Sequence, residues 1–391
     1  MDEKTRLIRA GAAPEPLART VGPPIQRGST VLLPNARSLY DHDVPTYGRQ
    51  GLAAQVTLQD ALAALEHAVG VALYPSGLAA LTGALLAVLK SGDEVLVVDN
   101  IYAPTRRFCE HVLKRYGVAV RYFDPAEPPE SLVGGASEAT RLILMESPGS
   151  LTLEMQDMPR MAELARARGM LTACDNTWAA GYLFQPLKHG IDISIQALTK
   201  YVGGHSDVFM GSAAARDPAL VRKLHDGVLH MGWAVSPDDA YLMLRGLRTL
   251  PARLARQGEN GLVVAQWLAA QPDVAALFHP AVPGHPGHAL WKRDFSGAAS
   301  LFSFALTPGP ETALDAFLDA LQLFGLGFSW GGFESLAISV DPQIHQRKFH
   351  KDYGGPLVRL HVGLEEPADL IEDLKQGLRA ASASVIPSVA G

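Results

Sequence analysis

The sequence predicts an α/β fold with a large domain built on a mostly parallel sheet, a smaller α+β domain after it and an extended arm before it. Three observations lead to this prediction. Apolar segments of strand length alternate with helical segments over much of the chain, as expected of βαβ units. That alternation ends near Gly246. At 391 residues, the chain also exceeds the size at which one core usually stops growing.

Residues 1–50 are predicted to be the arm. They contain several glycines and prolines, including Gly22-Pro23-Pro24, and show little hydrophobic periodicity, which is typical of extended chain. An arm of this length is ordered only when it packs against a protein surface.

Residues 51–246 are predicted to form the large domain. Six apolar segments are predicted strands, at 71–74, 94–98, 119–123, 142–145, 170–174 and 191–197. Helices are predicted between or before them, at 57–66, 78–90, 102–116 and 158–168.

Residues 247–391 are predicted to form the small domain. Its expected helices cover 254–271, 311–323 and 367–380, and its expected strands cover 299–306 and 358–362. Helices and strands that do not alternate regularly favour an α+β arrangement.

Composition narrows the possible partners and the compartment. The net charge is −6, and no basic stripe is interleaved with aromatic residues, so we expect no nucleic-acid partner. A hydrophobic content of 48% favours a homo-oligomer. The two cysteines form no spaced framework, the charged N-terminus lacks a signal-peptide core, and no apolar run could span a bilayer. We therefore expect a cytoplasmic protein that does not act on membranes.

One stretch suggests the chemistry. A buried strand over 169–174 delivers Asp175 at its carboxyl end, where open α/β sheets bind ligands, and a second apolar segment delivers Lys200. Pyridoxal phosphate is held by such a pair, with the lysine as a Schiff base and the aspartate against the pyridinium nitrogen. Taken alone, Lys200 is more often a surface lysine, and Asp175 equally suits a helix cap.

Further segments fit the same cofactor. Ser76-Gly77-Leu78 joins a strand to a helix, and that junction offers free N–H groups to a phosphate, although an ordinary helix cap looks the same. Arg49 could add charge, or lie in a solvated turn. Tyr102 follows another strand end and is suited either to core packing or to stacking on a flat ring.

The second domain holds the polar groups most suited to a substrate. Arg359 lies on a predicted strand, where a substrate carboxylate would satisfy its guanidinium, and Ser329-Trp330 lies in a glycine-rich segment. His285 and His288 have a spacing used by metal ligands, but they lie in a Pro/Gly loop without a third ligand nearby. We therefore predict no metal site.

These residues together resemble the pyridoxal-phosphate enzymes of cysteine and methionine metabolism, within fold type I of the aminotransferase-like enzymes. The resemblance covers nearly the whole chain. In chain order it is carried by Tyr47-Gly48-Arg49, Ser76-Gly77, Tyr102, Asp175-Asn176-Thr177, Thr199-Lys200-Tyr201, Gly204-His205-Ser206-Asp207, Arg245-Gly246-Leu247-Arg248-Thr249-Leu250, Gly332 with Glu334-Ser335-Leu336, and Arg359.

The resemblance implies a transferase-like large domain with a seven-stranded, mostly parallel sheet between helices, and a role for each motif. Lys200, Tyr102 and Asp175 would be catalytic. The cofactor would be bound by Lys200, Asp175, Tyr102, Ser76, Gly77, Leu78 and Thr199, and by Tyr47 and Arg49 of a neighbouring subunit. The substrate would be bound by Arg359, Ser329, Trp330 and Tyr47. A homotetramer built from dimers with shared active sites is the implied assembly.

Within this group the chain most resembles the bacterial cystathionine β-lyases. The discriminating stretches are Glu146-Ser147-Pro148-Gly149-Ser150, Asp175-Asn176-Thr177-Trp178-Ala179-Ala180-Gly181, Trp291-Lys292-Arg293-Asp294-Phe295 and Ser329-Trp330-Gly331-Gly332. The resemblance implies cleavage of L-cystathionine to L-homocysteine, pyruvate and ammonia, a transsulfuration-type step of methionine biosynthesis.

Two positions depart from the pattern. Similar β-lyases often carry Tyr where this chain has Phe328, and many wider relatives carry Ser where it has Ala197. A cystathionine or methionine γ-lyase and a cysteine desulfhydrase remain alternatives on the same fold, although γ-specific relatives tend to carry a glutamate near Phe328. A non-catalytic, cofactor-binding regulator is a further alternative.

Overall fold

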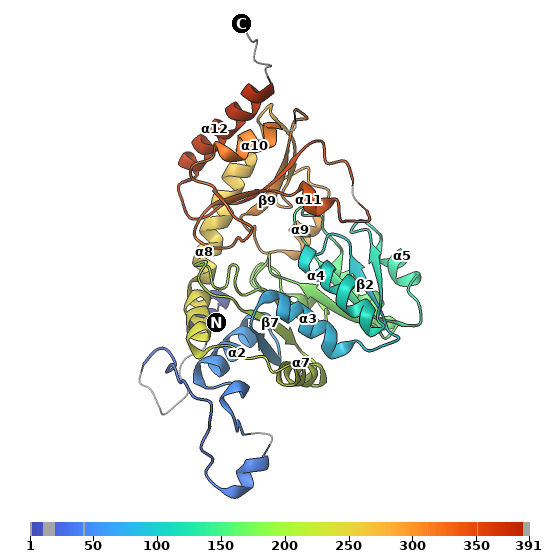
Figure 1. Cartoon of the computed structure of the whole chain (residues 1–391), viewed down its shortest axis with the longest axis vertical. Helices are drawn as coiled ribbons and strands as arrows, with labels where there is room; N and C mark the ends of the chain where they lie inside the picture. The colour runs from blue at the N-terminus through green and yellow to red at the C-terminus, as the bar shows by residue number, and fades with distance from the viewer. Residues whose placement is uncertain (1, 11–19, 42–43, 311, 350, 386–391) are drawn as a thin grey trace.

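Two β-sheets organise the chain, and a long helix connects them (Figure 1). The structure is a computed structural model that describes residues 2–10, 20–41, 44–310, 312–349 and 351–385. The first sheet uses strands that end before residue 216, and the second uses strands that begin after residue 273. The predicted α/β fold with a second, smaller sheet is confirmed.

The first sheet has seven strands in the order β1-β7-β6-β5-β4-β2-β3. β7 runs in the direction opposite to the other six strands, so the predicted mostly parallel, seven-stranded sheet is confirmed. Its strands are β1 (Gly70–Tyr74), β2 (Glu94–Val98), β3 (Ala119–Phe123), β4 (Thr140–Glu146), β5 (Leu171–Asp175), β6 (Ile193–Gln196) and β7 (Gly211–Ala215).

Strand β7 is absent from the sequence-based prediction. Its sequence, Gly-Ser-Ala-Ala-Ala, contains none of the β-branched or aromatic residues that favour strands. All five residues are buried between β1 and β6. A β-carbon at Gly211 would clash with the Ser76 carbonyl, so small residues here let helix α3 pack closely on the sheet.

Helices cover this sheet and carry its crossovers. α2 and α7 contact β1, α3 contacts β1, β6 and β7, and α6 contacts β5. The predicted helix over 102–116 begins at Ala103 and is helical to Tyr116, with a π-turn inside it and a 3₁₀ turn at its end. The elements are α2 (Ala53–Glu66), α3 (Gly77–Val88), α4 (Ala103–Phe108), the π-turn η3 (Cys109–Leu113), η4 (Lys114–Tyr116), α5 (Pro129–Gly134), α6 (Met158–Ala167), η5 (Pro186–His189) and α7 (Pro218–His230).

The second sheet has five strands in the order β10-β11-β12-β9-β8 and is packed against α8, α10 and α12 around its own apolar core. Its predicted strands near 299–306 and 358–362 are confirmed, whereas β8, β10 and β11 were not predicted. The elements are β8 (Val274–Phe278), α9 (His288–Asp294), β9 (Leu301–Leu306), α10 (Thr312–Asp319), β10 (Gly325–Leu326), β11 (Leu336–Ser339), α11 (Asp341–Ile344), β12 (Leu357–His361) and α12 (Pro367–Val385).

Helix α8 (Pro237–Ala269) is much longer than predicted. The sequence-based start at residue 254 was wrong, because the helix begins at Pro237 and continues through Pro251, a residue type that ordinarily interrupts a helix. The expected domain boundary after residue 246 therefore falls within α8. Figure 1 shows α8 running from the first sheet to the second, which makes it a shared element of both halves.

The N-terminal residues depart in part from the expected extended conformation. Glu3–Arg9 forms helix α1, whose Leu7 is buried and which contacts α2 and α8. Residues 20–41 and 44–50 are irregular except for η1 (Ala36–Tyr40) and η2 (Gly48–Gln50), and they extend away from the body (Figure 1). Residues 11–19 and 42–43 of the predicted arm lie outside the described residues.

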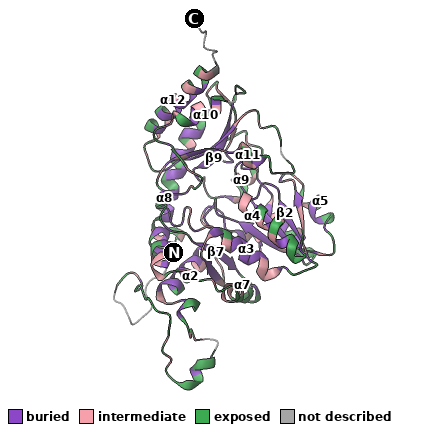
Figure 2. Cartoon of the chain, viewed as in Figure 1, coloured by how far each residue is buried: buried purple, intermediate pink, exposed green. Residues whose placement is uncertain are grey.

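Most of the described arm is exposed within the single chain (Figure 2). Several of its exposed residues are apolar. Val21 is 84% exposed, Leu32 93% and Tyr40 87%.

Among the described residues, no helix is both long and apolar enough to cross a membrane. Cys109 and Cys174 are free and buried.

Candidate active site

A cavity of about 320 Å³ lies where the carboxyl ends of β4 and β5 meet the segment after β6 and the second domain. It brings together most of the site residues predicted from sequence. Those lining it are Ser76, Gly77, Leu78, Tyr102, Asp175, Thr199, Lys200, Ser329, Trp330 and Arg359. Residues more than 250 positions apart therefore share one pocket. Its place agrees with the rule that open α/β sheets bind ligands at the carboxyl ends of their strands.

Lys200 lies at the centre of this arrangement and is partly buried. Its Nζ donates a hydrogen bond of 2.9 Å to the Ser329 hydroxyl and lies 5.4 Å from the centre of the Trp330 ring. Burial lowers the pKa of Lys200 to about 8, with further lowering by the charge of Arg359, while Asp175 opposes the shift. Near pH 8 a large share of this amine is therefore neutral and able to act as a nucleophile or base.

Asp175 ends strand β5 and is buried. Thr177 donates to it twice, from its backbone N at 3.1 Å and its hydroxyl at 2.5 Å, and both bonds go to Oδ1. Burial raises the pKa of Asp175, and these hydrogen bonds and Lys200 oppose the rise. Among the described residues no donor to Oδ2 is found, so that oxygen is available to a ligand nitrogen.

Glu146 is a lining residue that the sequence reasoning did not assign to the site. It ends strand β4 directly beside Asp175 in the parallel register, and it accepts a 2.8 Å hydrogen bond from the backbone N of Tyr102. Burial, and then repulsion by Asp175, raise the pKa of Glu146 well above its ordinary value. The strand-end rule that selected Asp175 would also have found Glu146.

Tyr102 caps helix α4, and 42% of it is exposed in the single chain. Its pKa is raised by burial and by the negative charges of Asp175 and Glu146. The side chain is consequently a neutral phenol at neutral pH, suited to stacking and to donating a hydrogen bond.

The start of helix α3 has the free N–H groups that the predicted phosphate cradle requires. Ser76 is the N-cap and accepts a 3.1 Å hydrogen bond from Ala79, while the N–H groups of Gly77 and Leu78 lie in the first turn, where a helix supplies no acceptor. A β-carbon on Gly77 would lie 2.8 Å from the Ala197 Cα. Only a glycine lets the two backbones come this close.

Thr199 lines the cavity, but its hydroxyl already has partners. It donates to the Met210 carbonyl at 3.1 Å and accepts from the Met210 N at 3.0 Å. These bonds fix the segment that carries Lys200 to the start of β7. A bond from this hydroxyl to phosphate would have to replace the one to the carbonyl.

Arg359 enters from strand β12 of the second sheet and is buried. Its Nη2 donates to the carbonyls of Phe328 and Ser329 at 2.8 and 3.4 Å. Burial lowers the pKa of Arg359 to about 10, yet the guanidinium remains charged at neutral pH. No carboxylate partner of Arg359 is found within the described residues, so its charge is suited to an anionic ligand.

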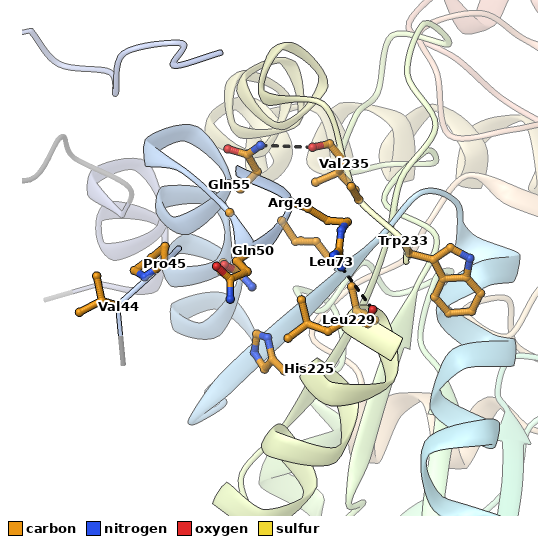
Figure 3. Close-up of a pocket in the computed structure, with 14 residues that line it drawn as sticks. Val44, Pro45, Arg49, Gln50, Gln55, Leu73, His225, Leu229, Trp233 and Val235 are labelled. Carbon is orange, nitrogen blue, oxygen red and sulfur yellow. Dashed lines mark hydrogen bonds between the residues drawn. The ribbon is translucent and has the colours of Figure 1, made fainter. Parts of the chain in front are cut away.

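Tyr47 and Arg49 do not line the cavity of their own chain. Arg49 instead lines a second cavity of about 240 Å³, next to α7 and the segment that joins α7 to α8. There it donates a 3.3 Å hydrogen bond to the Leu229 carbonyl, with His225 and Trp233 nearby (Figure 3). Within one subunit, these two predicted site residues are thus separated from Lys200.

The arrangement of Lys200, Asp175 and Arg359 around one cavity can be compared with known proteins. Residues 4–379 match the family described as Cys/Met metabolism PLP-dependent enzymes. The chain belongs to this family. The predicted family membership and the predicted cofactor, pyridoxal phosphate, are therefore confirmed, and the family acts on amino-acid substrates.

Individual relatives within the family match over nearly their full length. The chain is 42% identical to the cystathionine beta-lyase of Bordetella avium, covering 97% of this chain and 98% of that one. It is 39% identical to cystathionine beta-lyase MetC of Escherichia coli K12, with 95% and 97% covered. A crystal structure of cystathionine gamma synthase from Xanthomonas oryzae in complex with cystathionine matches with a TM-score of 0.91, 33% identity and 98% and 99% covered.

The residues of the cavity fit the family's cofactor. The free Oδ2 of Asp175 suits a protonated ring nitrogen, and the open first turn of α3 suits a phosphate. The Lys200 amine, whose pKa burial lowers to about 8, suits a bond to an aldehyde. The ring nitrogen, the phosphate and the aldehyde of the cofactor therefore each have a matching group in this chain.

Proposed function

We propose that the protein is a cystathionine β-lyase, which cleaves L-cystathionine to L-homocysteine, pyruvate and ammonia in methionine biosynthesis. The β-lyase relatives at 39–42% identity support this proposal. The observation that carries it is the cavity itself, where the Lys200 amine lies between a buried aspartate and a buried arginine.

The wall beside Ser329 favours β-elimination over γ-elimination. Phe328 lines the cavity, and 77% of this side chain is exposed. Among the described lining residues, the carboxylates are Asp175 and Glu146, at the ends of β5 and β4. An apolar side chain at position 328 supplies no acid or base that could move a proton near the γ-carbon.

The side chains divide the reaction between them. Arg359 binds the substrate carboxylate by two parallel hydrogen bonds, and Lys200 removes the proton from the α-carbon. The bond between Cβ and sulfur then breaks, the electron pair leaves with sulfur, and Lys200 returns its proton to the thiolate. Pyridoxal phosphate, when bound, supplies an electron sink for the α-carbon. The remaining three-carbon fragment is hydrolysed to pyruvate and ammonia.

The other predicted residues have supporting roles in this proposal. Tyr102 would stack on the cofactor ring and donate a hydrogen bond from its neutral phenol, and Asp175 would keep the ring nitrogen protonated. Ser76, Gly77 and Leu78 bind the phosphate, with Thr199 beside them. Ser329 and Trp330 orient the substrate carboxylate for Arg359.

We further propose that active sites are shared between subunits of a homotetramer. The position of Arg49 outside its own cavity and the exposed apolar side chains of the arm support this assembly. Residues 1–50 would reach a neighbouring subunit, where Tyr47 and Arg49 complete its phosphate and substrate sites. Residues 51–246 would bind the cofactor, and residues 247–391 would close the substrate side.

Product analysis tests the proposed reaction. The purified holoenzyme should release equal amounts of homocysteine and pyruvate from cystathionine, whereas a γ-lyase would release cysteine and 2-oxobutyrate. Lys200→Ala should lose the visible absorption of the lysine-bound cofactor and nearly all turnover, by a factor on the order of 10³ or more. A Lys200→Ala protein with normal turnover would remove the proposal, as would 2-oxobutyrate as the main product.

A further inference from the structure

Two side chains of strand β12 hold the same loop at the edge of the active-site cavity. Arg359 and His361 are two residues apart and therefore point to one face of the strand. Arg359 donates to the carbonyls of Phe328 and Ser329. His361 Nε2 lies 3.1 Å from both the Gly331 N and the Gly332 carbonyl oxygen.

The His361 ring is fully enclosed and neutral. It is 1% exposed, and burial lowers its pKa to about 4. A neutral imidazole can use Nε2 to accept from Gly331 or to donate to Gly332, so each tautomer binds the loop. Gly332 already accepts a 2.6 Å hydrogen bond from Gln257, which favours the tautomer that accepts from Gly331.

The other side of the ring connects to the residue that follows Lys200. Nδ1 of His361 lies 3.2 Å from the Ser300 hydroxyl, which lies 3.3 Å from the Tyr201 hydroxyl. The Tyr201 ring also packs edge-on against Trp330 and His361. One imidazole thus joins the loop to the backbone segment of Lys200.

The loop lies directly against that segment. Gly331 has a positive φ of 86°, and a β-carbon there would come within 2.7 Å of the Tyr201 N. Since Ser329 accepts the hydrogen bond from Lys200, a shift of the loop changes the surroundings of the reactive amine. On the side of Tyr201, little free space is left to absorb such a shift.

We infer that His361 is a positioning residue that fixes the 328–332 loop, so that Ser329 and Trp330 meet the Lys200 amine and Arg359 meets the substrate. The inference rests on the proposed function only for the identity of the substrate. His361 itself lies behind the loop and is absent from the lining of the cavity.

Two substitutions distinguish the hydrogen bonds of Nε2 from the hydrogen bond of Nδ1. His361→Gln places an amide near the position of Nε2, and should keep the loop bonds and a nearly normal KM. His361→Asn reaches only the Ser300 side, and should raise KM for cystathionine by about tenfold with a smaller fall in kcat. Amide hydrogen exchange at Gly331 in the holoenzyme should accelerate by about tenfold in His361→Asn and stay unchanged in His361→Gln.

A buried histidine elsewhere in the second domain provides the matched control. His279 is also fully buried and contacts the Phe302 ring, but it is not bonded to the loop. His279→Gln should change neither Gly331 exchange nor KM. Ser300→Ala removes the partner of Nδ1, and should shift both readouts in the direction of His361→Asn by a smaller factor. This variant keeps the inference testable if His361→Asn does not fold.

Three results would overturn the inference: equal effects of His361→Asn and His361→Gln, faster Gly331 exchange without a change in KM, and no response to Ser300→Ala. Failure of the proposed function is distinguishable from these results. If the unmodified enzyme leaves cystathionine intact, the substrate assignment is wrong, and the exchange comparison at Gly331 still decides whether His361 fixes the loop.

Discussion

At the scale of single residues, the proposed phosphate cradle depends on two small residues that face each other, Gly77 and Ala197. The α3 start approaches the segment after β6 so closely that a β-carbon on Gly77 would overlap Ala197. The contact involves the Ala197 backbone as well as its methyl group, so a rotamer change cannot relieve it. The space that this junction would offer to the cofactor phosphate is therefore set by the backbone.

Gly77→Ala should consequently weaken cofactor binding. Overpacking of this kind costs about 1–3 kcal/mol, which is on the order of a tenfold to hundredfold loss of affinity. The measurement is a titration of cofactor-free protein with pyridoxal phosphate, followed by visible absorption. Gly134→Ala is the control, because a β-carbon there meets no atom within 4 Å. Adding Ala197→Gly to Gly77→Ala should restore part of the affinity, and unchanged binding by Gly77→Ala would contradict the argument.

The residues of the site differ in how far the sequence alone could identify them. Lys200 and Asp175 follow apolar segments, and the strand-end rule brings them together. Glu146 obeys the same rule and was not selected as a site residue. Arg359 and Ser329 reach the cavity from another domain, so only a resemblance could place them beside Lys200.

At the scale of elements, a buried carboxyl group joins α2 to the edge of the active-site segment. Glu66, at the end of α2, is 1% exposed and accepts a 3.0 Å hydrogen bond from Ser194 of β6 and another from Gln196. Burial raises the pKa of Glu66 to about 7 from 4.5, although both hydrogen bonds lower it. Gln196 directly precedes Ala197, which abuts the phosphate cradle.

The stability of the protein should therefore fall as this group ionises. Between pH 4.5 and 7, folded Glu66 keeps a proton that the unfolded chain has released, so its contribution is fully present below pH 4.5 and is lost as the pH rises through 7. The full loss is about 3 kcal/mol. Glu66→Gln cannot ionise, and its free energy of unfolding relative to the unmodified protein should rise from pH 5 to pH 8 in urea titrations.

The control for this prediction is the same substitution, glutamate to glutamine, at an exposed position. Glu259 is exposed on α8, and Glu259→Gln should show no comparable pH dependence between pH 5 and 8. If the free energies of unfolding of Glu66→Gln and the unmodified protein differ by a constant amount from pH 5 to pH 8, Glu66 does not titrate in this range.

Elements with strong periodicity were predictable, and those determined by packing were not. β2 and β3 were predicted to the residue, because branched and aromatic side chains favour strands. β7 consists of small residues whose strand conformation depends on pairing with β1 and β6. α8 continues through Pro251, which local rules treat as a break.

At the scale of the whole molecule, the arm is the feature that a single subunit leaves unexplained. Arg49 lines a cavity next to α7, where its guanidinium donates a hydrogen bond to the backbone carbonyl of Leu229. A guanidinium is a strong binder of phosphate, and a carbonyl uses little of that capacity. The sequence assigned Arg49 to a neighbouring subunit only through the family resemblance, because no local pattern reveals which subunit a side chain will serve.

Mixed oligomers test whether Arg49 acts across subunits. Arg49→Ala keeps the Lys200 amine, and Lys200→Ala keeps the guanidinium, so a mixed dimer holds one site with both groups and one site with neither. Random mixing of equal amounts should restore about a quarter of the activity of the unmodified enzyme, since half of the dimers are mixed and half of their sites are complete. The measurement is pyruvate release after the two inactive variants are unfolded and refolded together.

A double variant distinguishes complementation from an effect of refolding. Arg49→Ala/Lys200→Ala, refolded together with either single variant, has no pairing that yields a complete site and should remain inactive. Arg49→Lys refolded alone should keep more activity than Arg49→Ala, because lysine retains the charge without the planar fork that matches a phosphate. Its relative gain in activity on refolding with Lys200→Ala should therefore be smaller. If the activity stays at the level of the separate variants, Arg49 acts within its own subunit. The exposed apolar residues of the arm would then need another explanation.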